Sequence, residues 1–205
     1  MSKERLLAFS DGVFAIIITI MVLELRPPEG DTFASLKPLL PKVISYILSF
    51  IYIGIYWNNH HHLFQIVKHV SGRVLWRNLH LLFWLSLVPF VTAWMGENHF
   101  SSNAVILYGI ILLMNSIAYY FLLHSLLALH GKESLLSYSV GKDFKGKVSS
   151  VIYIVGIGLC FINAWIGFAL YSFVAMIWFI PDKRIERKEI IESENADGKK
   201  WNSKL

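Results

Sequence analysis

Apolar residues in this chain are gathered into long blocks, and polar and charged residues lie between the blocks. A helix needs roughly 20 apolar residues to cross the hydrocarbon core of a bilayer. The pattern predicts six such helices, separated by charged, polar or proline-containing segments. Their approximate bounds are 5–25, 43–64, 74–94, 104–126, 149–163 and 164–180. We therefore expect an all-α, polytopic membrane protein with six transmembrane helices.

The last two predicted helices are short, and only Asn163 and its neighbours separate them, so the pattern alone also allows one broken or tilted segment. The distribution of charge favours two helices. With six helices and a cytoplasmic N-terminus, 16 of the 19 Lys and Arg residues lie in the cytoplasm, as the positive-inside rule predicts. A single merged helix would put the basic C-terminal tail outside. We therefore expect both termini to be cytoplasmic.

Composition supports a membrane protein and excludes other classes. The chain is 55% hydrophobic and 16% charged, whereas soluble domains carry about 25% charged residues. The net charge of +5 is explained by basic loops, and no basic stripe alternates with aromatic residues. We therefore expect the lipid bilayer as a partner, in a multi-pass protein of the cell membrane, and no nucleic acid. Residues 1–181 are predicted to form the membrane domain, and 182–205 a charged cytoplasmic tail that is partly disordered.

The first predicted helix carries Arg5 and Asp11 near its cytoplasmic end. Charged groups inside a transmembrane helix normally face the bundle interior, pair with another group or line water. Six residues separate the two side chains, which is about 600° of helical rotation, so they lie on different faces. We expect each of them to meet a neighbouring helix. The sequence leaves open whether they only hold helices together or also take part in function.

The same helix carries an apolar stripe formed by Ile16, Ile20 and Leu23, with Thr19 close to it. Their i, i+4, i+7 spacing puts them on one face of a helix. Such a face can simply contact lipid. Alternatively, it can form apolar rings around a symmetry axis, and such a constriction gates an ion pathway by dewetting.

The second helix carries three successive histidines, His60, His61 and His62. They point about 100° apart on a helix, so at most two of them can share a metal site, and a zinc-binding pair on a helix prefers i, i+4 spacing. Hydrogen bonding between helices is the stronger interpretation. We expect His60 or His61 to be a partner of Asp11, with Asn78 of the third helix at a similar depth. No catalytic set, cofactor site or metal site is predicted.

Several segments together resemble one known family. They are Arg5-x-x-x-Phe9-Ser10-Asp11-Gly12-Val13-Phe14-Ala15-Ile16, Trp57-Asn58-Asn59-His60-His61-His62, Asn78 with Leu81-Leu82-Phe83, and Trp178-Phe179-Ile180-Pro181-Asp182. The first closely resembles the signature of the transmembrane protein 175 family of potassium channels. The others are similar to further landmarks of that family, so the resemblance extends over the whole membrane region.

The resemblance implies a prokaryotic, single-repeat channel subunit that assembles as a homotetramer around a central pore lined by the first helices. Ile16, Ile20 and Leu23 would form the hydrophobic constriction, and Thr19 would lie beside it. Arg5, Ser10 and Asp11 would hold the helix in place through Trp57, His60 or His61, and Asn78. Potassium would be the permeant ion, and no enzymatic activity is expected.

Two alternatives to a passive potassium channel remain at the level of sequence. Asp11 and the histidines are also compatible with a proton-conducting or proton-coupled transporter, although neither broken helices nor an inverted repeat is evident. A membrane enzyme or metal protein that uses His60 to His62 would contain bound metal.

Overall fold

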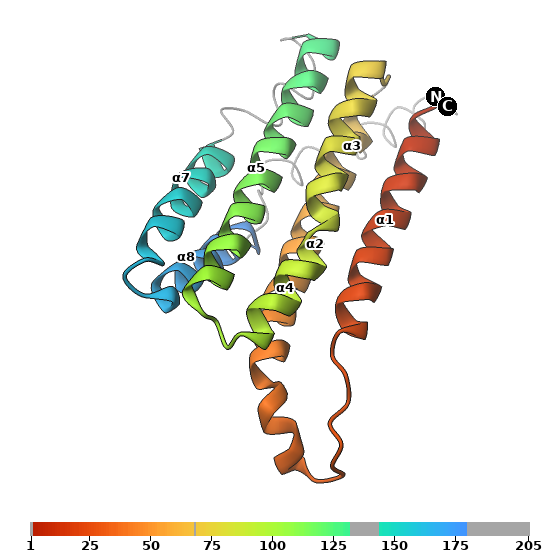
Figure 1. The fold of residues 1–205 in the computed structure, drawn as a ribbon. Coiled ribbons are helices and arrows are strands. Elements are labelled where there is room, and N and C mark those ends of the chain that lie inside the picture. The colour runs from red at the N-terminus through yellow and green to blue at the C-terminus, as the bar shows by residue number, and fades with distance from the viewer. Residues whose placement is uncertain (1, 68, 132–143, 180–205) are drawn as a thin grey trace, which may run out of the picture.

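A computed structural model of the protein describes residues 2–67, 69–131 and 144–179, and within these residues the chain is helical with no strand. Figure 1 shows long helices lying side by side, with α1 at one edge of the bundle and the shorter α7 and α8 at the other. The described elements are α1 (Lys3–Leu23), η1 (Phe33–Leu39), α2 (Leu40–Ile66), α3 (Gly72–Ser86), α4 (Val88–Glu97), α5 (Ser102–His130), α7 (Phe144–Leu159) and α8 (Ala164–Phe179).

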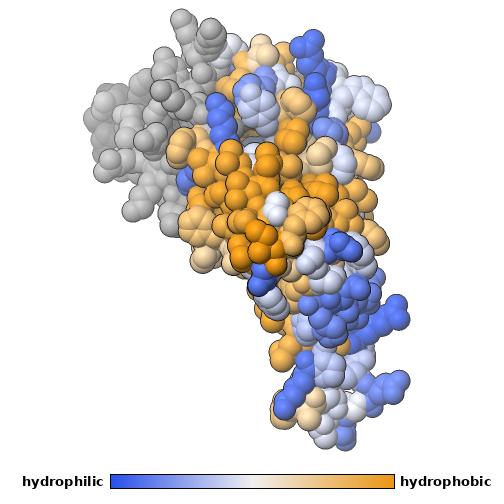
Figure 2. All heavy atoms as spheres, turned by 60° about the vertical axis from the view of Figure 1, so that its left-hand side comes forward, coloured by the Kyte–Doolittle hydropathy of each residue, from blue (hydrophilic) through white to orange (hydrophobic). Residues whose placement is uncertain are grey.

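The lengths and apolar character of these helices fit a multi-pass membrane protein. Four described helical stretches, 3–23, 33–66, 72–97 and 102–130, are long and apolar enough to cross a bilayer. The shorter helices α7 and α8 pack against each other and against α5, which gives the six passes predicted from the sequence. Figure 2 shows a broad apolar band across one face of the molecule, with hydrophilic residues toward both ends.

The third predicted span is not one continuous helix. The sequence predicts a single helix over 74–94, but the structure breaks it at Leu87 into α3 and α4. Pro89 lies in the first turn of α4, where it has no N–H to donate to a carbonyl of the preceding turn. The two helices follow each other along the same pass, and α3 packs mainly against α5 whereas α4 packs mainly against α2.

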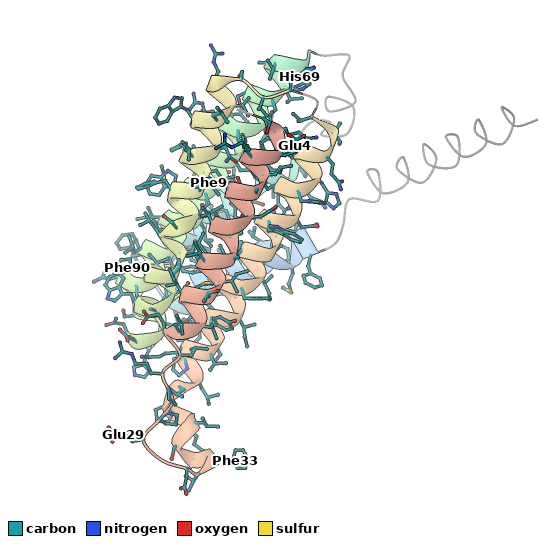
Figure 3. The ribbon with its side chains drawn as sticks, turned by 90° about the vertical axis from the view of Figure 1, so that its right-hand side faces the viewer. Glu4, Phe9, Glu29, Phe33, His69 and Phe90 are labelled. Atoms are coloured by element: carbon teal, nitrogen blue, oxygen red, sulfur yellow. The ribbon has the colours of Figure 1, made fainter. Side chains whose placement is uncertain are left out.

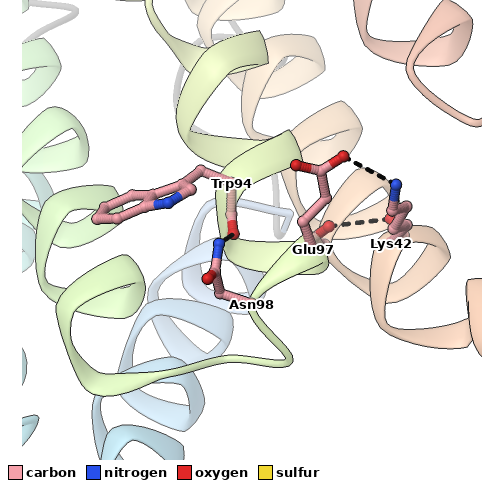
Figure 4. A network of polar contacts seen from close by, with 5 residues as sticks. Lys42, Trp94, Glu97 and Asn98 are labelled. Atoms are coloured by element: carbon pink, nitrogen blue, oxygen red, sulfur yellow. Dashed lines mark hydrogen bonds and ion pairs between the residues drawn. The ribbon is translucent and has the colours of Figure 1, made fainter.

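The connection between α1 and α2, together with the first turns of α2, projects beyond the ends of the other helices (Figure 1). Glu29 and Phe33 lie on this projection, and Glu4 and His69 lie at the opposite end of the bundle (Figure 3). At the base of the projection, Lys42 of α2 forms an ion pair with Glu97 of α4 at 2.9 Å (Figure 4). Because the pair is partly exposed, it contributes little to stability. It marks the place where the start of α2 lies against the end of α4.

The interior of the bundle contains polar side chains whose hydrogen bonds join different helices. The Ser49 hydroxyl lies 2.6 Å from that of Thr92 and 3.0 Å from that of Tyr108. The Tyr52 hydroxyl donates to the main-chain carbonyl of Tyr171 at 2.6 Å. These bonds join α2 to α4, α5 and α8, and they satisfy polar groups that no water could reach inside a membrane.

The predicted charged tail, 182–205, and the end of the Trp178-to-Asp182 landmark lie outside the described residues.

Candidate functional site

Helix α1 has a buried face and an exposed face. Ser2 caps its N-terminus by accepting a hydrogen bond from the Arg5 amide, which satisfies one of the free N–H groups of the first turn. The buried residues recur every three or four positions and pack against α2, α3 and α4. They are Leu6, Ser10, Phe14, Ile17 and Met21.

The exposed face of α1 contains the apolar stripe predicted from the sequence. The exposed fractions of Ile16, Ile20 and Leu23 are 59%, 44% and 70%. These side chains fall within about 60° of one another around the helix axis. Thr19 is exposed at the edge of the stripe, and its hydroxyl donates to the Ala15 carbonyl at 2.9 Å. A single chain therefore leaves the whole stripe uncovered.

The stripe is longer than the three residues predicted from the sequence. Phe9 is 53% exposed, and Gly12 is also exposed. Phe9, Ile16 and Leu23 recur at intervals of seven residues, which holds them on one face of a helix over two successive heptads. This spacing is the signal in the sequence that identifies Phe9 as part of the face.

Asp11 lies between the buried and exposed faces of α1, where it meets α2. The Trp57 indole N–H donates to Asp11 Oδ1 at 3.0 Å. The His61 ring stacks on Trp57, with ring centroids 5.8 Å apart, and Gln65 lies 2.9 Å from the other side of His61. Asp11, Trp57, His61 and Gln65 are all exposed, so this cluster lies on the surface of the single chain, and Asp11 points about 140° away from Ile16 around the axis of α1.

A second polar cluster is fully buried and joins α1, α2 and α3. The Asn78 amide nitrogen donates to the Ser10 hydroxyl at 3.0 Å, and Ser10 in turn donates to the Leu6 carbonyl at 2.9 Å. The Asn78 carbonyl oxygen lies 2.8 Å from His60 Nε2. Because that oxygen can only accept, Nε2 is the protonated nitrogen of His60. The His60 ring also packs edge-on against Phe14.

The two clusters differ from the sequence expectation in one respect. We expected His60 or His61 to be the partner of Asp11, but among the described residues neither histidine hydrogen-bonds to its carboxylate. His60 points into the α1–α3 contact, and His61 lies against Trp57. Successive residues on a helix point about 100° apart, so one histidine is buried and the next is exposed.

Arg5 lies on the exposed face of α1. Eleven residues separate it from Ile16, and eleven residues complete about three helical turns, so both side chains point in the same direction. Its guanidinium forms no hydrogen bond or ion pair with another residue in the part of the chain that the structure describes.

No group of three or more His, Cys, Asp or Glu residues could hold a metal ion within residues 2–67, 69–131 and 144–179. The rings of His61 and His62 make an edge-to-face contact, with their centroids 5.8 Å apart.

Comparisons with known proteins identify relatives of the chain. Residues 5–89 match the family model described as endosomal/lysosomal potassium channel TMEM175. A potassium channel from Chryseobacterium sp. (strain P1-3) is 56% identical over 187 residues, which cover 91% of this chain and 97% of that protein. The endosomal/lysosomal proton channel TMEM175 of Danio rerio is 27% identical over 195 residues, which cover 88% of this chain but only 36% of that protein.

A solved structure has the same fold. The crystal structure of a lysosomal potassium-selective channel TMEM175 homologue from Chamaesiphon minutus matches with a TM-score of 0.74 and 29% sequence identity. The match covers 86% of this chain and 95% of that chain.

Proposed function

The chain belongs to the TMEM175 family of potassium channels, and from that premise we propose that it forms a passive, potassium-permeable pore in the prokaryotic plasma membrane. The pore is a homotetramer in which the exposed faces of four α1 helices surround a central axis. Its subunits conduct ions and carry out no enzymatic reaction. Several features of the single chain support this proposal.

The observation that carries the proposal is the exposure of Asp11. This residue lies eight positions into α1, about 12 Å from its first residue along the axis, and it is exposed on the single chain. A carboxylate at such a position is costly against lipid, so it lies against protein or water in the membrane. The exposed surface of α1 around Asp11 is therefore covered by another copy of the chain or by a water-filled space.

The apolar stripe then faces the axis and provides the constriction. Four copies of Ile16, Ile20 and Leu23 form three successive apolar rings along the ion pathway. An ion that enters such rings loses water and gains no ligand, so the rings resist conduction when they are narrow. Thr19 contributes a hydroxyl at the level between the first two rings. The polar end of the pathway carries Arg5.

The two polar clusters hold α1 in its place in the subunit. The Asn78 and Ser10 side chains fix the buried face of α1 to α3, and Trp57 fixes Asp11 to α2. Because both clusters act on the first half of α1, they orient the stripe that follows. This arrangement supports a positioning role, rather than contact with the ion, for Ser10, Asp11, Trp57, His60 and Asn78.

A proton-conducting pathway is the second candidate, because a relative from Danio rerio is described as a proton channel. The buried cluster does not favour it. Its hydrogen bonds run from His60 through the Asn78 amide to Ser10 and end on the main-chain carbonyl of Leu6. An amide does not pass a proton onward. This series of hydrogen bonds also does not extend to both ends of the bundle.

Flux measurements on purified protein in liposomes distinguish these functions. We expect potassium to cross in response to its own gradient, at a higher rate than sodium, with no requirement for a proton gradient. Protein-free liposomes set the background. Flux that appears only with a proton gradient, or no flux above that background, would reject the passive channel.

A further inference from the structure

A pocket of about 400 Å³ opens among α2, α5, α7 and α8. Its volume lies in the range of roughly 300–1,000 Å³ that is typical of ligand pockets. No residue of α1 lines it, so it is separate from the proposed pore. Its walls are mostly apolar and aromatic, with Ile55, Tyr56, Ile117 and Tyr153 among them.

The pocket lies where the described part of α7 begins and that of α8 ends, and both helices are shorter than α2 and α5. Each of them has 16 residues, whereas α2 has 27 and α5 has 29. The first turn of α7, with Gly146 and Lys147, and the last turn of α8, with Trp178, both line the pocket. The Trp178 indole donates to Ser149 Oγ at 2.9 Å, so these two helix ends are at the same depth.

The mouth of the pocket has the chemistry of a membrane interface. Lys147 is exposed there, and its ammonium has no ion-pair or hydrogen-bond partner among the described residues. The Lys145 ammonium lies 6.0 Å from the centre of the Trp178 ring. Tryptophan and lysine side chains gather where the hydrocarbon core meets the lipid headgroups. This end of the bundle also carries Lys3 and Arg73, and we refer to it as the basic end.

Aromatic side chains line the pocket further from the basic end. Tyr153 lies six residues after Lys147 on α7, about 9 Å further from the basic end, and it lines the pocket together with Tyr52. Several other polar groups on the wall are hydrogen-bonded, such as Ser116 to Ser150, but the Tyr56 hydroxyl has no hydrogen-bond partner among the described residues. An unpaired hydroxyl in apolar surroundings is unfavourable, so it provides a donor for a ligand that reaches this depth.

We propose that the pocket binds an anionic phospholipid from the membrane leaflet at the basic end of the bundle. The lipid phosphate pairs with the Lys147 ammonium at the mouth. A glycerol-ester carbonyl accepts the hydrogen bond of the Tyr56 hydroxyl, and one acyl chain fills the apolar space toward Tyr52 and Tyr153. Basic pockets between transmembrane helices recognise anionic headgroups in this way. The second acyl chain remains in the bilayer, because the volume suits one chain.

Native mass spectrometry of the purified full-length protein tests the proposal, with added phosphatidylglycerol or phosphatidylcholine of identical acyl chains. The wild type is expected to retain phosphatidylglycerol about fivefold better, the effect of one lysine near a membrane surface. Lys147→Gln removes this preference. Arg73→Gln is the matched control, because it removes one positive charge from the same end on α3, which does not line the pocket.

Two further variants test whether the acyl chain occupies the pocket. Ile55→Trp and Ile117→Trp fill it from opposite walls, α2 and α5, and each is expected to lose bound phosphatidylglycerol. Using both keeps the test valid if one variant fails to assemble. Equal retention of the two lipids by the wild type overturns the proposal. So does an unchanged preference in Lys147→Gln, or full lipid retention by a correctly assembled tryptophan variant. These lipid measurements do not depend on whether the protein conducts potassium.

Discussion

The Trp57 indole on α2 donates a hydrogen bond to the Asp11 carboxylate on α1 over 3.0 Å. This contact is the one described hydrogen bond between the Asp11 side chain and another residue of the chain. Asp11 points about 140° away from Ile16 around the axis of α1, so this contact ties the proposed pore-lining helix to the rest of the subunit without using the face that carries the stripe. Its loss is expected to affect both stability and assembly.

Asp11→Ala is expected to lower the free energy of unfolding by about 1–2 kcal/mol, because a hydrogen bond to a charged group is lost. It should also shift the purified protein toward smaller oligomers. Thermal unfolding and size-exclusion chromatography in detergent measure the two effects. Trp57→Phe and the double variant complete a cycle, in which contacting residues show a coupling of at least about 0.5 kcal/mol. Strictly additive effects would contradict a direct role for this hydrogen bond.

Ser10→Ala is expected to cost about 1–3 kcal/mol, because it leaves the buried Asn78 amide without its acceptor. Ser172→Ala is the matched control. Ser172 also donates to a carbonyl four residues earlier in its own helix, Phe168 at 2.9 Å, but no other described side chain bonds to it. Thermal unfolding of the two variants measures the difference. If both variants lose the same stability, the hydrogen bond between α1 and α3 contributes no more to the free energy of unfolding than a bond within one helix.

Ile16→Asn is expected to raise potassium conductance severalfold, because a polar side chain allows water to enter the apolar constriction. Val22→Asn is the control, since Val22 is 44% exposed on the same helix but points about 120° away from Ile16. Single-channel or liposome flux recordings measure the change. An assembled Ile16→Asn channel with unchanged or reduced current would exclude Ile16 from the constriction, and an equal rise in Val22→Asn would show that the effect is not specific to the stripe.

Gly109→Ala is expected to destabilise the bundle by about 1–3 kcal/mol, the usual cost of overpacking. A Cβ atom there would collide with the Tyr171 phenol, which is fully buried and has no room to move. Gly158→Ala is the control, because nothing lies within 4 Å of its added Cβ, and alanine favours a helix by up to about 1 kcal/mol over glycine. A thermal midpoint that falls in the first variant and holds or rises in the second is the predicted result.

The sequence predicts much of the fold because the bilayer imposes simple rules. Apolar blocks of sufficient length locate the helices, and the distribution of Lys and Arg supports six passes even where α7 and α8 are short. Within the predicted third span, Pro89 marks the break between α3 and α4. A proline inside a transmembrane helix does not always interrupt it, and an apolar pattern alone does not distinguish a kink from a stop.

The side-chain partners are less predictable from the sequence. Residues at similar depth can be identified, and Asn78 does join Ser10 and His60. Which of three successive histidines faces a neighbouring helix depends on the rotation of α2 about its axis, which the sequence does not reveal because apolar residues occur on all sides of this helix. The family resemblance implies that Trp57 is among the residues that hold the first helix, but only the structure pairs it with Asp11. The seven-residue interval from Phe9 to Leu23 was present in the sequence.

The most direct measurement is ion flux through the purified protein in liposomes, with potassium, sodium or protons as the only permeant cation. We predict a potassium flux that follows its own gradient, exceeds the sodium flux and increases in Ile16→Asn. Flux that needs a proton gradient, or wild-type and Ile16→Asn proteins that both conduct no better than empty liposomes, would contradict a passive potassium pore lined by α1.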